Sequence, residues 1–352
     1  MNYFQGKNGP YIIAEIGGNH EGNMEYARKL TCLAAESGAD AVKFQIYTGD
    51  SLVNPLLDPD RNKHFKKFEL TPEQYIELAL LCRKLNVAFM ASVWDINAFH
   101  YIDPYIGIYK IGSGDLTAFN LLKKAVATGK PLILSTGLAT GDEVLASIAF
   151  IRQIDSSYIT DKKVAILQCT AMYPIPDGDA NLNVMHTLAR QTGLPVGYSD
   201  HTVGMEALET AVAMGAQILE MHFTDTRENK TFRDHQVSAT QNEIQQLIEK
   251  IKKTRLLQGG YEKKPAPSEI GTGHIHSFRR GVYPARDLRK DTIIQEEDLV
   301  TLRPCKGIAA SFFYELIGKR LLVDVQKMQE LSFDFFEFPA LQSEEKSIVK
   351  SF

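Results

Sequence analysis

The chain has 352 residues, enough for one large α/β domain and a smaller second domain. Its net charge of −4 leaves no broad basic surface, so we expect neither nucleic acid nor a membrane as a main partner. The four cysteines are widely spaced without a CxxC pair, which predicts reduced thiols rather than a disulfide framework. We also expect no export signal, so we expect a cytoplasmic protein.

Short β-type runs alternate with helical patterns from the start of the chain to about residue 260. The expected strands span residues 11–14, 41–45, 88–92, 108–111, 131–135, 164–169, 195–199 and 218–223. The clearest helical patterns span residues 24–37, 71–85, 141–154 and 241–257. Eight strands that alternate with helices over about 250 residues predict an α/β fold of the closed (β/α)8 TIM barrel type. An open doubly wound sheet is the alternative, although EIGGNHEGN after the first strand is not the GxGxxG turn of a dinucleotide-binding fold.

The composition changes beyond residue 260. Residues 262–277 are rich in Lys, Pro, Gly and Ser, which predicts an exposed linker. Short β-type stretches separated by turns then predict a compact β-rich domain, which is too small to bury a large core alone. We therefore divide the chain into a barrel domain (1–261), a linker (262–277), a small domain (278–340) and a polar tail (341–352).

Two histidines end the last two expected strands of the barrel, His201 in GYSDHT and His222 in EMHFT. Neutral imidazoles at neighbouring strand ends can share one divalent metal ion. Two protein ligands would leave positions open for water and substrate oxygens, which suits Lewis-acid catalysis. The alternative is a pair of histidines that bond only to backbone or carboxylate groups.

Groups suited to a phosphate recur at the other strand ends, which face one shared pocket in a barrel. Lysines act as point charges and serine hydroxyls donate to phosphate oxygens. The candidates are Lys43, Lys110, Ser113, Ser135 and Ser199. Lys43 and Gln45 lie two residues apart on one strand, so both point to the same face. The alternative is that the lysines pair with structural carboxylates such as Glu15 or Glu220.

These motifs resemble a known family. AEIGGNHEGN, VKFQ, YKIGSGD, ILSTG, QCTAMYP, GYSDHT and EMHFT resemble the barrel of the sialic acid synthases. FRRGVYPARDL and IIQEEDLVTLRP resemble their C-terminal antifreeze-like (SAF) domain, and the resemblance covers nearly all of residues 10–325. It implies a transferase of sialic acid biosynthesis that condenses phosphoenolpyruvate with an open-chain N-acyl hexose. N-acetylmannosamine would give N-acetylneuraminate and phosphate, and related members make legionaminic or pseudaminic acid.

The resemblance also implies roles for individual residues. His201 and His222 would hold Mn²⁺ or Mg²⁺. Phosphoenolpyruvate would bind Lys43, Ser92, Lys110, Ser113, Ser135 and Ser199, and the two lysines would also stabilise the reacting anion. The sugar would contact Glu15, Tyr173, Asp234, Phe278 and Arg303. Glu15 is the candidate for proton transfer, and Arg303 would reach the N-acyl group from the SAF domain of the partner in a domain-swapped homodimer.

Three segments depart from the family pattern, and all lie where the substrate is expected. ASVWD stands where STPFD is common, Ala171-Met172 replaces an asparagine before YP, and FRDH stands where GPDH is usual. The acceptor sugar therefore stays open, and it includes a 6-phosphorylated hexose with Arg233 as an added anion contact. Two other functions remain: a Schiff-base aldolase with Lys110 as nucleophile, and a catalytically silent carbohydrate-binding protein.

Overall fold

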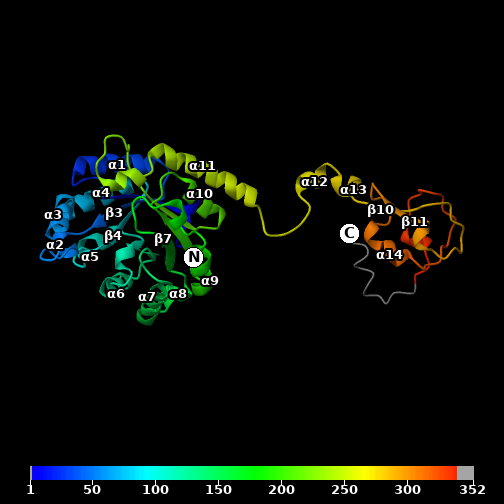
Figure 1. The fold of residues 1–352 in the computed structure, drawn as a ribbon, viewed down its shortest axis with the longest axis horizontal. Helices are drawn as coiled ribbons and strands as arrows, with labels where there is room; N and C mark the ends of the chain where they lie inside the picture. The colour runs from blue at the N-terminus through cyan, green and yellow to red at the C-terminus, as the bar shows by residue number, and fades with distance from the viewer. Residues whose placement is uncertain (1, 339–352) are drawn as a thin grey trace. The chain divides into compact units, whose positions relative to one another are not determined.

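The computed structural model describes residues 2–338, and the chain divides between Gly259 and Gly260 into two compact units. The first unit is drawn in blue to yellow-green in Figure 1, and the second in yellow to red. Each unit is described by itself below. None of the helices in residues 2–338 combines the length and the apolar character needed to cross a membrane.

The first unit is a closed barrel of parallel strands. These are β2 (Gly9–Gly17), β3 (Ala41–Ile46), β4 (Ala88–Val93), β5 (Tyr109–Ile111), β6 (Leu132–Ser135), β7 (Val164–Cys169), β8 (Val196–Asp200) and β9 (Ile218–His222). Each strand pairs with the next in the sequence, and β9 pairs in parallel with β2 to close the ring. The predicted (β/α)8 barrel is therefore confirmed, and the open doubly wound sheet is excluded.

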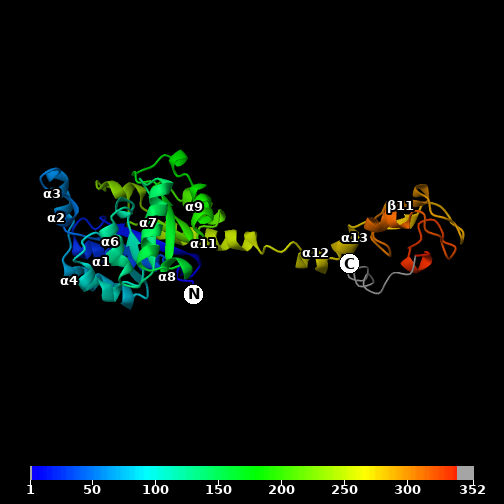
Figure 2. The same ribbon diagram turned by 90° about the horizontal axis from the view of Figure 1, so that it is seen from below.

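Helices surround these strands in both views of the unit (Figures 1 and 2). They are α1 (Met24–Glu36), α2 (Gly49–Leu52), α3 (Pro59–Lys67), α4 (Pro72–Lys84), α5 (Phe99–Ile102), α6 (Phe119–Val126), α7 (Gly141–Ile154), α8 (Ser157–Thr160), α9 (Val184–Thr192), α10 (Glu206–Ala213) and α11 (Gln241–Gln258). Local sequence fixes several starts: the side chains of Thr71 and Thr140 accept hydrogen bonds from the third residue of α4 and α7 and form capping boxes.

Successive side chains of each strand alternate between the core under the helices and the interior of the barrel, and this alternation places the polar residues in the interior. On β3, Val42 and Phe44 belong to the core between strands and helices. Because successive side chains point to opposite faces, Lys43 points into the barrel. On β2, Ile13 belongs to the interior core, and Glu15, two residues later, faces the same way.

A short N-terminal hairpin, which the sequence analysis did not expect, adds to the interior core. Strand β1 (Gln5–Gly6) pairs antiparallel with the first residues of β2. Phe4 is almost fully buried and packs in the same interior cluster as Met90 and Ile133. This cluster fills the barrel below the polar residues, so the site is built at the carboxyl ends of the strands.

The second unit has a small core of its own around an antiparallel pair, β10 (Gly281–Pro284) and β11 (Leu299–Leu302). Val282, Ile294, Leu299 and Leu321 are among the buried residues of that core. Its short helices are α12 (Pro267–Gly271), α13 (His274–Ser277) and α14 (Phe313–Leu316). The first two fall in the segment assigned to a linker, which is mostly exposed. The predicted tail at 341–352, and the last residues of the predicted small domain, lie outside the described residues.

Candidate active site

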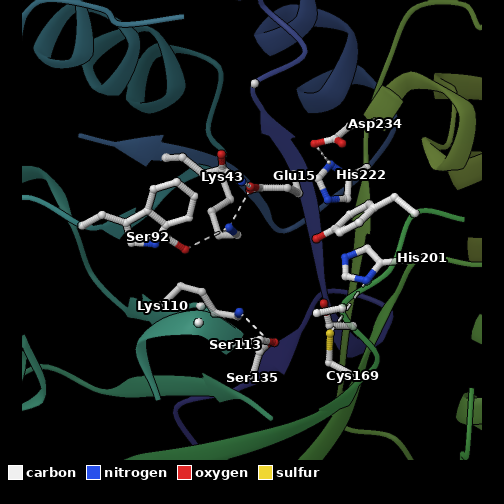
Figure 3. A pocket seen from close by; sticks show the side chains of 18 of the residues that line it. Glu15, Lys43, Ser92, Lys110, Ser113, Ser135, Cys169, His201, His222 and Asp234 are labelled. Carbon is white, nitrogen blue, oxygen red and sulfur yellow. Dashed lines mark hydrogen bonds and ion pairs between the residues drawn. The ribbon is translucent and has the colours of Figure 1, made fainter. Parts of the chain in front are cut away.

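The carboxyl ends of the barrel strands enclose a pocket of about 780 Å³, whose inner part is shown in Figure 3. The pocket brings together the residues that the sequence analysis singled out in the barrel. They are Glu15, Lys43, Ser92, Lys110, Ser113, Ser135, Tyr173, Ser199, His201, His222 and Asp234. They come from almost every strand, so the closed ring of β2 to β9 is what assembles them.

Four buried charges form the centre of the pocket. Lys43 Nζ lies 2.7 Å from Glu15 Oε2 and 3.3 Å from Glu220 Oε1. Lys110 Nζ lies 3.2 Å from Glu220 Oε2. All four side chains are at most 5% exposed, so each charge depends on its partners for stabilisation. We call Glu15, Lys43, Lys110 and Glu220 the charge cluster; its formal charges sum to zero.

The electrostatics favour the charged forms of Glu220 and Lys43. Burial by itself would raise the pKa of Glu220, but Lys110 and Lys43 hold that pKa below its usual range. Burial would likewise lower the pKa of Lys43, whereas Glu15 and Glu220 raise it. The pairing of the lysines with Glu15 and Glu220, which the sequence analysis gave as the alternative, is therefore present in the structure.

Hydroxyl groups surround the two ammonium groups. Lys43 donates to Ser92 Oγ at 3.2 Å, and Lys110 donates to Ser135 Oγ at 2.6 Å (Figure 3). Ser113 follows β5 and its Oγ accepts from the backbone N–H of Gly137 at 3.0 Å. Two cations flanked by hydroxyls in a recess of this kind can bind the oxygens of a phosphate or a carboxylate.

The two histidines lie side by side at the opposite wall, with ring centroids 5.4 Å apart. His201 Nδ1 lies 2.8 Å from the carbonyl oxygen of Thr170, a contact that requires the proton on Nδ1 and leaves the lone pair on Nε2. Burial, and next the neighbouring His222, lower the pKa of His201 to about 3, so the ring is neutral at physiological pH.

His222 has an unsatisfied nitrogen. Its Nδ1 is buried and has no hydrogen-bond partner among residues 2–338; Asp234 Oδ2 lies 3.9 Å away. A neutral His201 with a free Nε2 and a His222 with an unpaired buried nitrogen fit the donor set of a divalent metal ion. No group of three or more His, Cys, Asp or Glu side chains in the described chain is arranged to hold a metal, so water or substrate would complete the coordination.

Tyr173 and Asp234 lie next to this pair. The Tyr173 ring centroid lies 4.0 Å from that of His201, and burial raises the pKa of its phenol, which therefore stays a neutral hydrogen-bond donor. Arg233 lies over the Tyr173 ring, with its Cζ atom 4.4 Å from the ring centroid. The Nε atom of Arg233 lies 3.1 Å from Asp234 Oδ1. Arg233, which the sequence analysis offered as an anion contact, therefore pairs with Asp234 through Nε, while its side chain stays 63% exposed.

Two predicted residues do not lie in this pocket. Phe278 and Arg303 belong to the second unit, where Arg303 Cζ lies 5.7 Å from the Phe278 ring centroid. His274 stacks on Phe278 with centroids 4.3 Å apart. The role expected for these residues in sugar binding stays a prediction.

The sequence analysis missed several residues of the pocket. Glu220 was expected as a carboxylate partner of the lysines, and the structure shows that it pairs with both of them; the residues that follow were not expected. Asp115 lines the pocket, and burial raises its pKa to about 6 against an opposing effect of Lys110. His64, Phe68 and Phe232 form an aromatic flank. Asp58-Pro59, an N-cap followed by a proline in the first turn, was a signal for α3, which carries His64.

Comparison with known proteins places the chain in a family. The NeuB family model matches residues 30–263, and the SAF domain model matches residues 279–335. The chain is 35% identical to the N,N'-diacetyllegionaminic acid synthase of Legionella pneumophila, over 93% of this chain and 94% of the relative. It is 33% identical to the Campylobacter jejuni protein of the same name, over 88% of this chain and 94% of that relative.

A solved structure agrees. The N-acetylneuraminic acid (sialic acid) synthetase of Leptospira borgpetersenii superposes with a TM-score of 0.70 at 30% identity and covers 76% of this chain and 91% of that one. The resemblance to the sialic acid synthases is therefore confirmed by sequence and by structure. The chain belongs to the NeuB family and carries a SAF domain in its second unit.

Proposed function

We propose that this protein is a phosphoenolpyruvate-dependent nonulosonic acid synthase, which condenses phosphoenolpyruvate with an open-chain N-acyl hexose. The observation that supports this function is the charge cluster with its serines facing the His201–His222 pair inside one pocket. The cluster offers a place for a small polyanion, and the histidine pair offers a place for a metal beside it. The relatives' names point to the same class of reaction.

Phosphoenolpyruvate is proposed to bind over Lys43 and Lys110, with Ser92, Ser113, Ser135 and Ser199 donating to its phosphate and carboxylate. Support comes from the burial of both lysines and from their contacts with Ser92 and Ser135. In the structure the lysines pair with Glu15 and Glu220. These carboxylates compensate the buried ammonium charges and so stabilise the cluster before the substrate arrives. An incoming polyanion would compete with the carboxylates for the same ammonium groups.

His201 and His222 are proposed to hold the divalent ion, Mn²⁺ or Mg²⁺. When bound, such an ion supplies a Lewis acid for the aldehyde oxygen of the sugar. The protein prepares for this ion by keeping His201 neutral and by fixing its tautomer through the Thr170 carbonyl. Asp234, near His222 and paired with Arg233, is proposed to contact the sugar.

The proposed reaction forms one carbon–carbon bond and breaks one carbon–oxygen bond. C3 of phosphoenolpyruvate attacks the aldehyde carbon, and the aldehyde oxygen gains a proton to become a hydroxyl. Water adds its oxygen to C2, and the bond from C2 to the phosphate oxygen breaks, leaving a 2-keto acid. The two water hydrogens end on the new hydroxyl and on phosphate. No redox partner is needed.

Residues of this chain have distinct parts in these steps. Lys43 and Lys110 stabilise the phosphate as it leaves, because fixed cations in a dry pocket act strongly on developing negative charge. Glu15, buried beside Lys43 and hydrogen-bonded to Gln45 Nε2 at 2.9 Å, is proposed to transfer the proton. The neutral Tyr173 phenol is proposed to donate to a sugar hydroxyl.

We further propose that two chains form a domain-swapped dimer in which the SAF domain of the partner brings Phe278 and Arg303 to the sugar. Support comes from the SAF match and from the pairing of an exposed Phe278 ring with the Arg303 cation. The use of phosphoenolpyruvate supports a cytoplasmic location. The acceptor is an N-acylated hexose: N-acetylmannosamine, its 6-phosphate, or the precursor of legionaminic or pseudaminic acid.

The test is a set of reactions of the full chain with phosphoenolpyruvate, Mn²⁺ and each acceptor. Release of phosphate together with a product of the summed mass is the expected result, and chelation of the metal should stop it. Absence of turnover with every N-acyl hexose would instead favour a carbohydrate-binding protein. A covalent adduct on Lys110 after borohydride treatment with pyruvate would favour the Schiff-base aldolase.

A further inference from the structure

The loop after β2 carries a buried asparagine that the proposed reaction does not use. Asn19 lies two residues beyond the end of β2, within the EIGGNHEGN motif, and it is fully buried. Its Nδ2 group donates to the carbonyl oxygen of Phe223 at 2.8 Å and to Ser238 Oγ at 2.8 Å. The two acceptors lie 204 and 219 residues further along the chain. Asn19 therefore joins the loop after the first barrel strand to the segment that follows the last one.

Each of the two bonds ends beside a residue of the candidate active site. Phe223 directly follows His222, and Ser238 Oγ donates to the carbonyl oxygen of Asp234 at 2.7 Å. A serine hydroxyl has one proton, so Ser238 accepts from Asn19 and passes its own proton to Asp234. This relay fastens the backbone of Asp234 to the chain at the end of β9.

Only a side chain with two donor hydrogens can make this connection. The Nδ2 group has two hydrogens, and the bonds to Phe223 and Ser238 use both. The Oδ1 atom of Asn19 is buried and has no hydrogen-bond partner in the described chain, so the two donated bonds are what this side chain contributes. A carboxylate in the same place would face the Phe223 carbonyl with an acceptor and would draw the Ser238 proton away from Asp234.

The relay holds a loop residue against a strand residue. Asp234 lies in the short helix η4 (Arg233–Val237), between β9 and α11, whereas His222 ends β9. Asp234 Oδ2 lies 3.9 Å from His222 Nδ1, and both residues line the pocket (Figure 3). A loop residue keeps such a position only where other groups fix it, and a misplacement of 1 Å can cost a reaction about 100-fold in rate.

We propose that Asn19 is a positioning residue that fixes Asp234 relative to His222 and thereby orients the acceptor sugar. This inference rests on the proposed synthase function and adds to it a residue that acts without touching either substrate. A second anchor keeps the course of the segment when Asn19 is changed, because His235 Nδ1 lies 2.8 Å from Thr224 Oγ1. Loss of the relay should therefore displace Asp234 without unfolding the loop.

The test compares three quantities in the wild type and in Asn19→Asp: kcat/KM for the sugar, KM for phosphoenolpyruvate, and the Mn²⁺ concentration that gives half of the rise in Tm. Asn19→Asp keeps the shape of the side chain, and it should lower kcat/KM for the sugar about 10–100-fold. The other two quantities should stay within about twofold. His222 keeps its place because the N–H of Phe223 still donates to the Glu15 carbonyl at 2.8 Å.

Two serine variants complete the test. Ser238→Ala removes the second half of the relay and leaves the bond from Asn19 to Phe223, so it should give the same pattern with a smaller loss. It also preserves the test where Asn19→Asp does not fold. Ser147→Ala is the matched control: Ser147 is also fully buried and donates to the Leu116 carbonyl at 2.9 Å, but it does not line the pocket. All three quantities should stay at their wild-type values in this control.

The outcomes separate this inference from the proposed function. Equal losses for the sugar, phosphoenolpyruvate and Mn²⁺ in Asn19→Asp would show a general support of the barrel, which overturns the positioning role and leaves the synthase standing. An unchanged kcat/KM for the sugar would overturn it as well, as would a Ser238→Ala protein that matches the wild type. A wild type that releases no phosphate with any acceptor would overturn the proposed function, and the positioning role with it.

Discussion

Replacement of Glu220 by glutamine tests whether the charge cluster is the anion site. Glutamine keeps the shape of the side chain but removes one negative charge, so the cluster changes from neutral to a net charge of +1. Lys110 is affected most, because Glu220 is its ion-pair partner within residues 2–338, at 3.2 Å. Lys43 keeps Glu15 at 2.7 Å.

The size of the effect follows from the burial of these groups. Removing one partner of a buried ion pair costs about 3–5 kcal/mol, because the other charge is left without compensation. For a unit of this size, 1 kcal/mol corresponds to roughly 2–4 °C in Tm, so Glu220→Gln should melt roughly 6–20 °C below the wild type. Ser135, which accepts from Lys110 at 2.6 Å, should keep the loss toward the lower end.

Added anion should reverse much of this loss. Inorganic phosphate would supply the negative charge that Lys110 has lost, and an anion at about 100 times its Kd stabilises a folded protein by about 2.7 kcal/mol. Thermal melts of both proteins with increasing phosphate should therefore show a larger rise in Tm for Glu220→Gln. Glu249→Gln, at a surface pair with Lys252, is the matched control and should melt within about 2 °C of the wild type.

Two results would contradict this reasoning. A Glu220→Gln protein that melts with the wild type would show that Lys110 does not depend on Glu220. A lowered Tm that phosphate raises by the same amount in both proteins would show that the cluster is an ordinary structural ion-pair network. In that second case the proposed phosphoenolpyruvate site would have to be sought elsewhere in the pocket.

Four further substitutions probe the rest of the site. His222→Ala should abolish metal-dependent turnover and the rise in Tm caused by Mn²⁺, while the fold, followed by circular dichroism, persists; unchanged activity would remove His222 as a ligand. Lys110→Ala should raise KM for phosphoenolpyruvate and leave KM for the sugar, so normal kinetics with phosphoenolpyruvate would argue against the anion site. Arg303→Ala should raise KM for the sugar alone, and an unchanged value would return Arg303 to a surface role. Asp115→Asn should stabilise the protein at pH 7 by at most about 3 kcal/mol. The reason is that Asp115 has a pKa of about 6 in the folded protein instead of 3.8, so the wild type loses stability as the pH rises through 6. In denaturant melts the gain should vanish below about pH 4, and a difference that does not change with pH would contradict the burial of this carboxyl group.

The sequence could predict the inner part of the site because strand alternation determines it. In AVKFQI, apolar Val42 and Phe44 flank Lys43, so a buried strand must turn the lysine to the opposite face from its neighbours. The same logic places Glu15 after Ile13. Once a closed barrel is assumed, polar residues at strand ends must meet, which is why His201 and His222 could be paired in advance.

Other features depend on geometry that the sequence does not contain. Glu220 lies on β9, yet its partners are on β3 and β5, so its bridging position requires the cross-section of the closed barrel. Phe68 and Phe232 meet because a helical insertion and a late loop fold to the same flank. The hairpin with Phe4 is too short to show a periodic pattern, since β1 has two residues.

Some pocket residues stand on strands and others on loops, and this difference affects which of them related proteins can share. The charge cluster and the histidine pair stand on strands or directly at their ends, and those positions are fixed by the barrel. Trp94, Phe68 and Phe232 stand beyond the strand ends, and Trp94 and Phe232 lie in two of the segments where this chain departs from the family pattern. A loop residue can change without disturbing the barrel. The reaction type can therefore persist while the substrate contacts beyond the strands change, which agrees with the different acids named for the Legionella and Leptospira proteins, each about one-third identical to this chain.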